Sequence, residues 1–247
     1  MHNKTIKLGV LSSYCWIDPG YKESCNLPSL TENADFDPIT LKQIPPIKRR
    51  RLSGLSKLAM HTSLNCIDPA VSSSEDCLSV FASQHGELNR TINIVDSMFQ
   101  EHEVSPKDFS LSVHNASLGL FSIFTKNKQA GTSIAAGPDT FGYALLESYN
   151  LLQRFPGKQV LLTCFDLEVS HPLSELQKKL YPSYSLSLLL ASPNAAPSSI
   201  GLSFQPQSNL QVAELPMALA FYDFLHKKDS SIAITTDDTS WKFMKNV

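Results

Sequence analysis

The sequence lacks the short motifs by which most cofactor sites and hydrolase sites are recognised. It contains neither GxGxxG nor GxxxxGK[ST], so no phosphate-binding glycine loop is predicted. It contains no GxSxG, the turn that holds the nucleophile of an α/β-hydrolase. Its 7 histidines include no HExxH and no i, i+4 pair, and its 5 cysteines form no CxxC. We therefore expect no cofactor and no metal site.

Long apolar runs and a strong net charge are absent as well. No stretch approaches the roughly 20 apolar residues of a transmembrane helix, and the N-terminus has no apolar core of a signal peptide. The formal net charge of -2 argues against nucleic acid as a partner. The odd number of cysteines is typical of free thiols in a reducing compartment. We expect a cytoplasmic protein that binds neither nucleic acid nor membrane.

The hydrophobic pattern predicts a single α/β domain over residues 1–247 with a mixed sheet of about five strands. Apolar runs predict strands at 6–11, 78–82, 131–136, 160–165, 186–191 and 200–204, with a further possible strand at 231–235. Helical spacing predicts helices at 52–66, 88–99, 105–113, 117–125, 139–153 and 215–225. A proline-rich excursion is expected at 17–47, and a less regular C-terminal extension is expected from about 206.

The strand, turn and helix around Gly137, Pro138 and Asp139 form the best candidate for a catalytic turn. A helix N-terminus at such a turn lowers the pKa of a thiol and binds an oxyanion. Gly137 and Pro138 are chemically inert, however, and Asp139 is interpreted as a helix cap or dipole partner. Thr140 would need an adjacent base, which the sequence does not show. The helix that follows is apolar around nearly its whole circumference, so we expect it to be buried between two layers, for example two sheets.

A basic run, Lys48-Arg49-Arg50-Arg51, is the one sharp cluster of charge. It is interpreted either as a solvated loop and helix start or as a docking surface for an acidic partner.

Several of these segments resemble the N-terminal half of β-ketoacyl synthases, which have the thiolase fold, and in particular the chain-length-factor-like family. The resemblance covers roughly residues 5–205, and its most specific part is Ser112-Val113-His114-Asn115-Ala116. The matching stretches are 80–88, 105–116, 133–137 with the following helix, 161–166 and 184–191. The resemblance implies a thiolase-like half fold with the buried helix packed on the sheet.

In the catalytic relatives, the turn carries the cysteine that accepts the acyl chain, and here the matching position falls at or beside Pro138. The histidines that assist condensation lie in a C-terminal half that this sequence does not contain. The resemblance therefore implies the fold without the condensing activity. It also implies a dimer strand made of Ser133, Ile134 and Ala135, and a segment that borders a partner's pocket. The residues of that segment are His114, Asn115, Leu118 and Phe121. For these residues and for those of the dimer strand, an ordinary core position is the alternative.

The resemblance favours a non-catalytic partner that pairs with a catalytic β-ketoacyl synthase, or with itself, in a fatty acid, polyketide or aryl polyene-type pathway. Arg49, Arg50 and Arg51 would attract an acidic acyl carrier protein. The alternative is an unorthodox acyltransferase or thioester hydrolase acting on acyl carrier protein or coenzyme A thioesters. Its nucleophile would be Cys164, although an apolar strand predicts an inert buried thiol there. A half-size relic or a self-associating structural protein is the third hypothesis.

Overall fold

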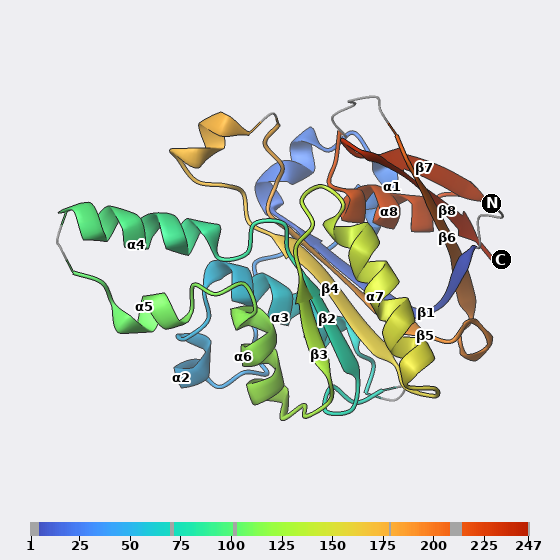
Figure 1. The fold of residues 1–247 in the computed structure, drawn as a ribbon, viewed down its shortest axis with the longest axis horizontal. Coiled ribbons are helices and arrows are strands. Elements are labelled where there is room, and N and C mark those ends of the chain that lie inside the picture. Colours follow the sequence, from blue (N-terminus) through green and yellow to red (C-terminus); the bar gives the residue numbers. More distant parts are fainter. Residues whose placement is uncertain (1–4, 70–71, 101–102, 178, 208–213, 247) are drawn as a thin grey trace.

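One mixed sheet of 8 strands forms the centre of the chain, in the order β3-β2-β4-β5-β1-β6-β8-β7 (Figure 1). The computed structural model describes residues 5–69, 72–100, 103–177, 179–207 and 214–246. The strands are β1 (Ile6–Ile17), β2 (Leu78–Ala82), β3 (Gly131–Ile134), β4 (Val160–Asp166), β5 (Tyr184–Ala191), β6 (Ser198–Pro206), β7 (Ser231–Thr235) and β8 (Thr239–Lys245). The α/β class and the mixed sheet are confirmed, but the prediction of about five strands is wrong. The expected C-terminal extension supplies β7 and β8, which continue the same sheet through β6.

Helices cover both faces of this sheet. The α-helices are α1 (Pro28–Asn33), α2 (Pro46–Arg49), α3 (Gly54–Cys66), α4 (Leu88–Gln100), α5 (Pro106–Ser110), α6 (Ala116–Thr125), α7 (Thr140–Arg154) and α8 (Met217–His226), with short 3-10 turns at Pro19–Ser24, Leu173–Leu176 and Pro193–Ala195. The helices α7 and α8 pack in one apolar core, and α3 and α6 pack in the core on the other face. Because both faces are covered, β4 and β5 are buried along their whole length.

The helix α7 lies against one sheet and not between two. The expected burial on all sides is wrong, because Tyr143 is 43% exposed and Asn150 is also exposed. The far end of the same sheet nevertheless reaches α7, since the indole of Trp241 on β8 packs against Gly142. A Cβ atom added at Gly142 would lie only 2.5 Å from that indole. Glycine is therefore required there by close packing.

The proline-rich excursion at 17–47 is folded onto the sheet by specific hydrogen bonds. The indole N–H of Trp16 donates to the carbonyl of Asp37 at 2.8 Å. The hydroxyl of Tyr222, on α8, donates to the carbonyl of Asn33 at 2.9 Å. The segment holds α1 and α2 and is thus more regular than its composition predicted.

Asp35 is the charged anchor of this excursion, and its removal gives a first prediction. Its carboxylate accepts a hydrogen bond from Tyr14 at 2.6 Å and lies 3.0 Å from Nε2 of His61. Burial acts to raise the pKa of Asp35, but the hydrogen bonds from Tyr14, the Asp37 N–H and His61 outweigh it and lower the pKa below its usual value. A lowered carboxyl pKa adds stability above the unfolded pKa of about 3.9, and this stability is lost as pH falls through the folded pKa. We expect Asp35→Asn to cost about 1–2 kcal/mol at pH 7 and to flatten the loss of stability below pH 4.

Urea unfolding of both proteins between pH 3 and pH 7 measures this effect. The matched control is Asp37→Asn, because Asp37 contributes its backbone groups to the anchor. Parallel stability curves for the wild type and Asp35→Asn would contradict the prediction.

Candidate functional site

The turn between β3 and α7 is closed by its own backbone. Gly137 has φ of +55°, a left-handed conformation that favours glycine. The N–H of Asp139 donates to the carbonyl of Ala136, and the N–H of Thr140 donates to that of Gly137, each at 3.1 Å. Pro138 lies at the exposed tip. The tight turn therefore exposes the chemically inert ring of Pro138 at the position where a nucleophile would be expected.

The two polar side chains of this turn are also engaged. The Thr140 hydroxyl is 4% exposed, donates to the carbonyl of Gly137 at 2.7 Å and accepts from the N–H of Ala136 at 2.9 Å. Asp139 is the N-cap residue of α7, but its side chain makes no capping hydrogen bond to an N–H of that helix. Its carboxylate instead accepts hydrogen bonds from Trp241 Nε1 and Thr236 Oγ1, each at 2.6 Å. Thr140 is thus a turn-closing residue, and Asp139 joins the turn to the region of β8.

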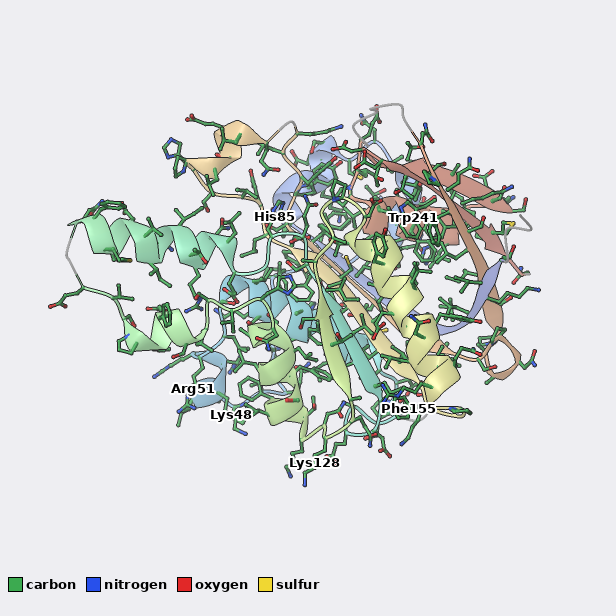
Figure 2. The ribbon with its side chains drawn as sticks, in the orientation of Figure 1. Lys48, Arg51, His85, Lys128, Phe155 and Trp241 are labelled. Atoms are coloured by element: carbon green, nitrogen blue, oxygen red, sulfur yellow. The ribbon has the colours of Figure 1, made fainter. Side chains whose placement is uncertain are left out.

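A cavity of about 270 Å³ lies beside the turn. It is lined by Gly137 and Pro138, by the loop after β2, by the end of β4, by residues 167–169, 176–177 and 179–182, and by the start of α8. Its titratable lining includes His85, Asp166, Glu168 and Lys179, and its apolar lining includes Phe141, Val169, Leu180 and Met217. No hydrogen bond of the described residues joins the ring of His85, labelled in Figure 2, to a hydroxyl or a thiol. Three other lining residues are in contact, since the sulfur of Cys164 lies 3.7 Å from the hydroxyl of Tyr184, which donates to the carboxylate of Asp166 at 3.4 Å.

Asp166 is a structural carboxylate at the edge of this cavity. It accepts hydrogen bonds from the Ser83 hydroxyl at 2.7 Å, the Gln84 N–H at 3.1 Å and the His85 N–H at 3.0 Å. Burial raises its pKa despite these bonds. The carboxylate joins the loop after β2 to the end of β4. The sequence analysis missed this role, and the only signal that could have indicated it is a single acidic residue at the end of an apolar strand.

Cys164, the nucleophile of the alternative hypothesis, is 1% exposed within β4. Burial, with a smaller contribution from the nearby Asp166, raises the pKa of its thiol well above the usual value. Its sulfur lies 3.7 Å from the hydroxyl of Tyr184, whose own pKa burial also raises. Because the thiolate is the reactive form, this environment makes Cys164 a poor nucleophile.

Thiol labelling provides a direct test of that conclusion. Under native conditions we expect iodoacetamide to modify Cys164 at least about 100-fold more slowly than Cys25, the one thiol of the chain that is not buried. In urea the two rates should converge, and peptide mass spectrometry measures both in the same sample. Equal labelling of Cys164 and Cys25 in the folded protein would reverse the argument.

The segment predicted as a dimer strand lies at the edge of the sheet. β3 pairs in parallel with β2, and its opposite edge pairs with no strand of the described part of the chain. Ser133 and Ile134 belong to β3 and are half-buried, whereas Ala135 follows the strand and is exposed. The side-chain oxygen of Ser133 is buried with no hydrogen-bond partner among these residues. This edge is open to a further strand.

The four residues predicted to border a partner's pocket differ in burial. Nε2 of His114 lies 2.8 Å from the carbonyl oxygen of Ser83, and Asn115 is exposed at the start of α6. Leu118 is half-buried and packs on Gly131 of β3. Phe121 is fully buried, with its ring centroid 5.3 Å from that of Phe81. Of the four, Phe121 presents no surface to a partner.

The basic run lies on α2 and on the connection to α3. Arg49 donates to the carbonyl of Thr40 at 2.7 Å, while Lys48, Arg50 and Arg51 are exposed. None of the four forms an ion pair with a carboxylate among the described residues. Figure 2 shows Lys48 and Arg51 at the lower edge of the view, well away from His85. The run is thus separate from the cavity.

None of the described helices combines the length and the hydropathy that a membrane span requires. No group of three or more histidine, cysteine, aspartate or glutamate side chains in the described part of the chain is arranged to hold a metal ion.

The sequence matches the family model of the β-ketoacyl synthase N-terminal domain over residues 23–244. The chain is also similar in structure to a chain of a ketosynthase in complex with its chain length factor from Xenorhabdus doucetiae. The two chains are 26% identical with a TM-score of 0.76, and the match covers 96% of this chain and 99% of the other. No protein with a curated description matches the sequence.

Two more distant structures share the fold. The ishigamide ketosynthase/chain length factor matches with a TM-score of 0.71 at 11% identity, over 97% of this chain and 99% of that one. A ketosynthase bound to a hexaketide and in complex with a type II polyketide synthase acyl carrier protein matches with a TM-score of 0.62 at 13% identity. That match covers 83% of this chain and 71% of the other.

Proposed function

The chain belongs to the β-ketoacyl synthase N-terminal domain family, and from that premise we propose that it is a non-catalytic, chain-length-factor-like partner of a catalytic β-ketoacyl synthase. It acts in a fatty acid, polyketide or aryl polyene-type pathway and helps to set the length of the acyl chain. The observation that carries this proposal is the turn at Gly137-Pro138-Asp139, which lies between a strand and a helix, borders a cavity and carries no cysteine. The end-to-end similarity to a chain from a ketosynthase and chain length factor complex supports it.

The open edge of β3 supplies the surface for this pairing. A strand with an unpaired row of N–H and C=O groups accepts a strand from a second subunit, which extends the sheet. Ser133 and Ile134 form this edge, and Ala135 lies at its end. Asn115 is the N-cap of α6, and Leu118 on α6 packs against Gly131 of β3. In this proposal both residues border the partner's acyl pocket.

Isolation of the native complex tests this function. The tagged chain, purified from its own cells, should bring down a β-ketoacyl synthase that has its catalytic cysteine. Deletion of the gene should change the chain length of the product or abolish the product. A Pro138→Ala variant should restore the wild-type product, because the turn does no chemistry. A strictly monomeric protein whose loss leaves the products unchanged would refute the proposal.

The environment of its candidate nucleophile argues against the alternative of an acyltransferase or a thioester hydrolase. Its nucleophile would be Cys164, whose thiol is buried and whose raised pKa keeps it protonated.

The basic run forms the docking surface for the acyl carrier protein in this proposal. The ammonium group of Lys48 lies 5.7 Å from the centroid of the Phe124 ring, so α2 lies beside the end of α6. The exposed residues Lys126 and Lys128 follow α6, and Figure 2 places Lys128 on the same edge of the view as Lys48. Positive charge is thus concentrated on one edge of a chain whose formal net charge is -2.

Charge reversal tests this docking surface. We expect Arg50→Glu/Arg51→Glu to raise the Kd for the acyl carrier protein of the same pathway by about tenfold or more at low salt, and less at high salt. The control Lys7→Glu/Lys228→Glu changes the net charge equally through two exposed residues outside the basic run, one on β1 and one just after α8. Titration by calorimetry or fluorescence anisotropy at two salt concentrations gives the Kd values. An equal loss of affinity in the two double variants would place the docking surface elsewhere.

A further inference from the structure

The helices α4 and α5 form an arm that extends away from the sheet (Figure 1). α4 contains no buried residue, although it is 13 residues long and amphipathic. The arm and the connection that follows it carry a concentration of exposed large apolar side chains. They are Val95 (45% exposed), Met98 (52%), Phe99 (80%), Val104 (37%), Phe109 (66%) and Val113 (50%). An exposed apolar group of this extent is typical of a protein interface.

Polar contacts hold the arm in place and leave these apolar side chains unused. Arg90 on α4 forms ion pairs with Glu87 at 3.2 Å and with Asp108 on α5 at 2.5 Å. The side chains of Arg90 and Glu87 are 15% and 4% exposed, so this is a sheltered network. Ser53, the N-cap of α3, donates to Glu87 at 2.5 Å and connects the arm to the body of the chain. The arm therefore keeps its position without burying its apolar face.

We propose that this apolar face binds the same partner subunit that pairs with β3, which makes the arm the second half of one interface. The inference rests on the proposed function, and the first reason for it is area. A stable interface buries about 800 Å² and roughly 20–30 residues on each side. β3 has 4 residues and cannot supply this alone. The exposed apolar side chains of the arm supply large contact area of the kind that contributes most to binding.

The second reason is that the arm is continuous with the open edge of β3. The connection after α5 carries the exposed Val113 and leads directly into α6. α6 contacts β3, with Leu118 packed on Gly131, and exposes Ile123 at 65%. A partner that pairs with β3 therefore also contacts α6 and, beyond α6, the arm.

The third reason is charge, which argues against the acyl carrier protein as the occupant. The exposed charged residues in the described part of the arm are two acids, Asp96 and Glu103, and one cation, Lys107. Its one arginine, Arg90, is already paired with two carboxylates. The described residues of the arm therefore offer an acidic protein no concentration of positive charge, whereas a largely apolar surface of a second thiolase-fold subunit fits the exposed apolar side chains.

Photo-crosslinking in the native cell separates this inference from the proposed function. The crosslinking amino acid p-benzoylphenylalanine is placed at Phe99 in one variant and at Thr132 of β3 in another, and mass spectrometry identifies the captured protein. We expect both positions to capture the same β-ketoacyl synthase. If Thr132 captures a synthase and Phe99 captures nothing, a second copy of this chain or any other protein, the arm proposal is overturned and the pairing through β3 stands. If neither position captures a synthase, the proposed function itself fails.

An affinity measurement on the purified complex provides the matched control. We expect Phe99→Asp/Phe109→Asp to weaken the complex at least about 30-fold. Both side chains are exposed, so the melting temperature of the isolated chain should not fall. Asn93→Asp adds charge to α4 on the side that lines the hollow between α4 and α5, and it should leave the affinity unchanged. Unchanged affinity in the double variant would overturn the proposal.

Discussion

The substitution Ser133→Pro is expected to abolish the complex with the partner synthase while leaving the isolated chain folded. In the parallel ladder of β2 and β3, the N–H of Ser79 donates to the carbonyl of Ala130, and the N–H of Ser83 donates to that of Ile134. Bonding alternates along such a ladder, so the backbone of Ser133 points to the open edge. Proline there removes a donor from that edge and projects its ring into the path of an added strand, but costs no bond to β2.

The expected loss is at least about 100-fold in Kd, or about 2.7 kcal/mol, which analytical ultracentrifugation or biolayer interferometry of the purified pair measures. Ser133→Ala is the matched control and should bind as the wild type does, because the Ser133 hydroxyl has no hydrogen-bond partner among the described residues. Thermal melting of each isolated chain verifies its fold. Full binding by a folded Ser133→Pro chain would show that the partner does not pair with β3.

The strongly periodic elements could be predicted from the sequence because local residues determine them. The strand at Leu78–Ala82 and the strand at Ser231–Thr235 have the predicted bounds, and α3 and α4 lie within two residues of theirs. β8 was missed although the inward Trp241 and Phe243 alternate with the exposed Lys242, because the alternation is short and follows a segment of weak pattern. The number of strands was therefore underestimated.

The contacts around the turn could not be predicted, because they join residues about 100 positions apart. The sequence identified a turn without a nucleophile at Pro138, and the structure places a cavity beside it. Asp139 is the N-cap residue of α7, but nothing local in the sequence shows that its carboxylate accepts hydrogen bonds from Thr236 and Trp241 and none from the helix. The requirement for glycine at position 142 could not be predicted for the same reason. Its lack of a side chain leaves room for the indole of Trp241, which is also distant in the sequence.

Trp241 is accordingly the residue whose removal should cost most stability. Its side chain is fully buried, its ring is stacked on Phe204 with centroids 4.9 Å apart, and its N–H donates to Asp139 at 2.6 Å. Trp241→Ala leaves a large cavity and takes a donor from the carboxylate of Asp139. We expect a loss of about 3–5 kcal/mol in the free energy of unfolding, measured by urea denaturation. Trp241→Phe keeps most of the apolar contact and should cost clearly less.

A double-mutant cycle with Gly142 shows whether the loss arises from the contact between α7 and β8. In the wild type, Gly142→Ala places a methyl group 2.5 Å from the indole and should cost about 1–3 kcal/mol. In the Trp241→Ala background the same methyl group enters the cavity, and alanine is the better helix former, so it should be neutral or stabilising by up to about 1 kcal/mol. The two substitutions should therefore be coupled by at least about 1 kcal/mol. Additive effects would mean that α7 does not depend on β8, and the turn at Pro138 would then have to be held by its own backbone bonds and by Thr140.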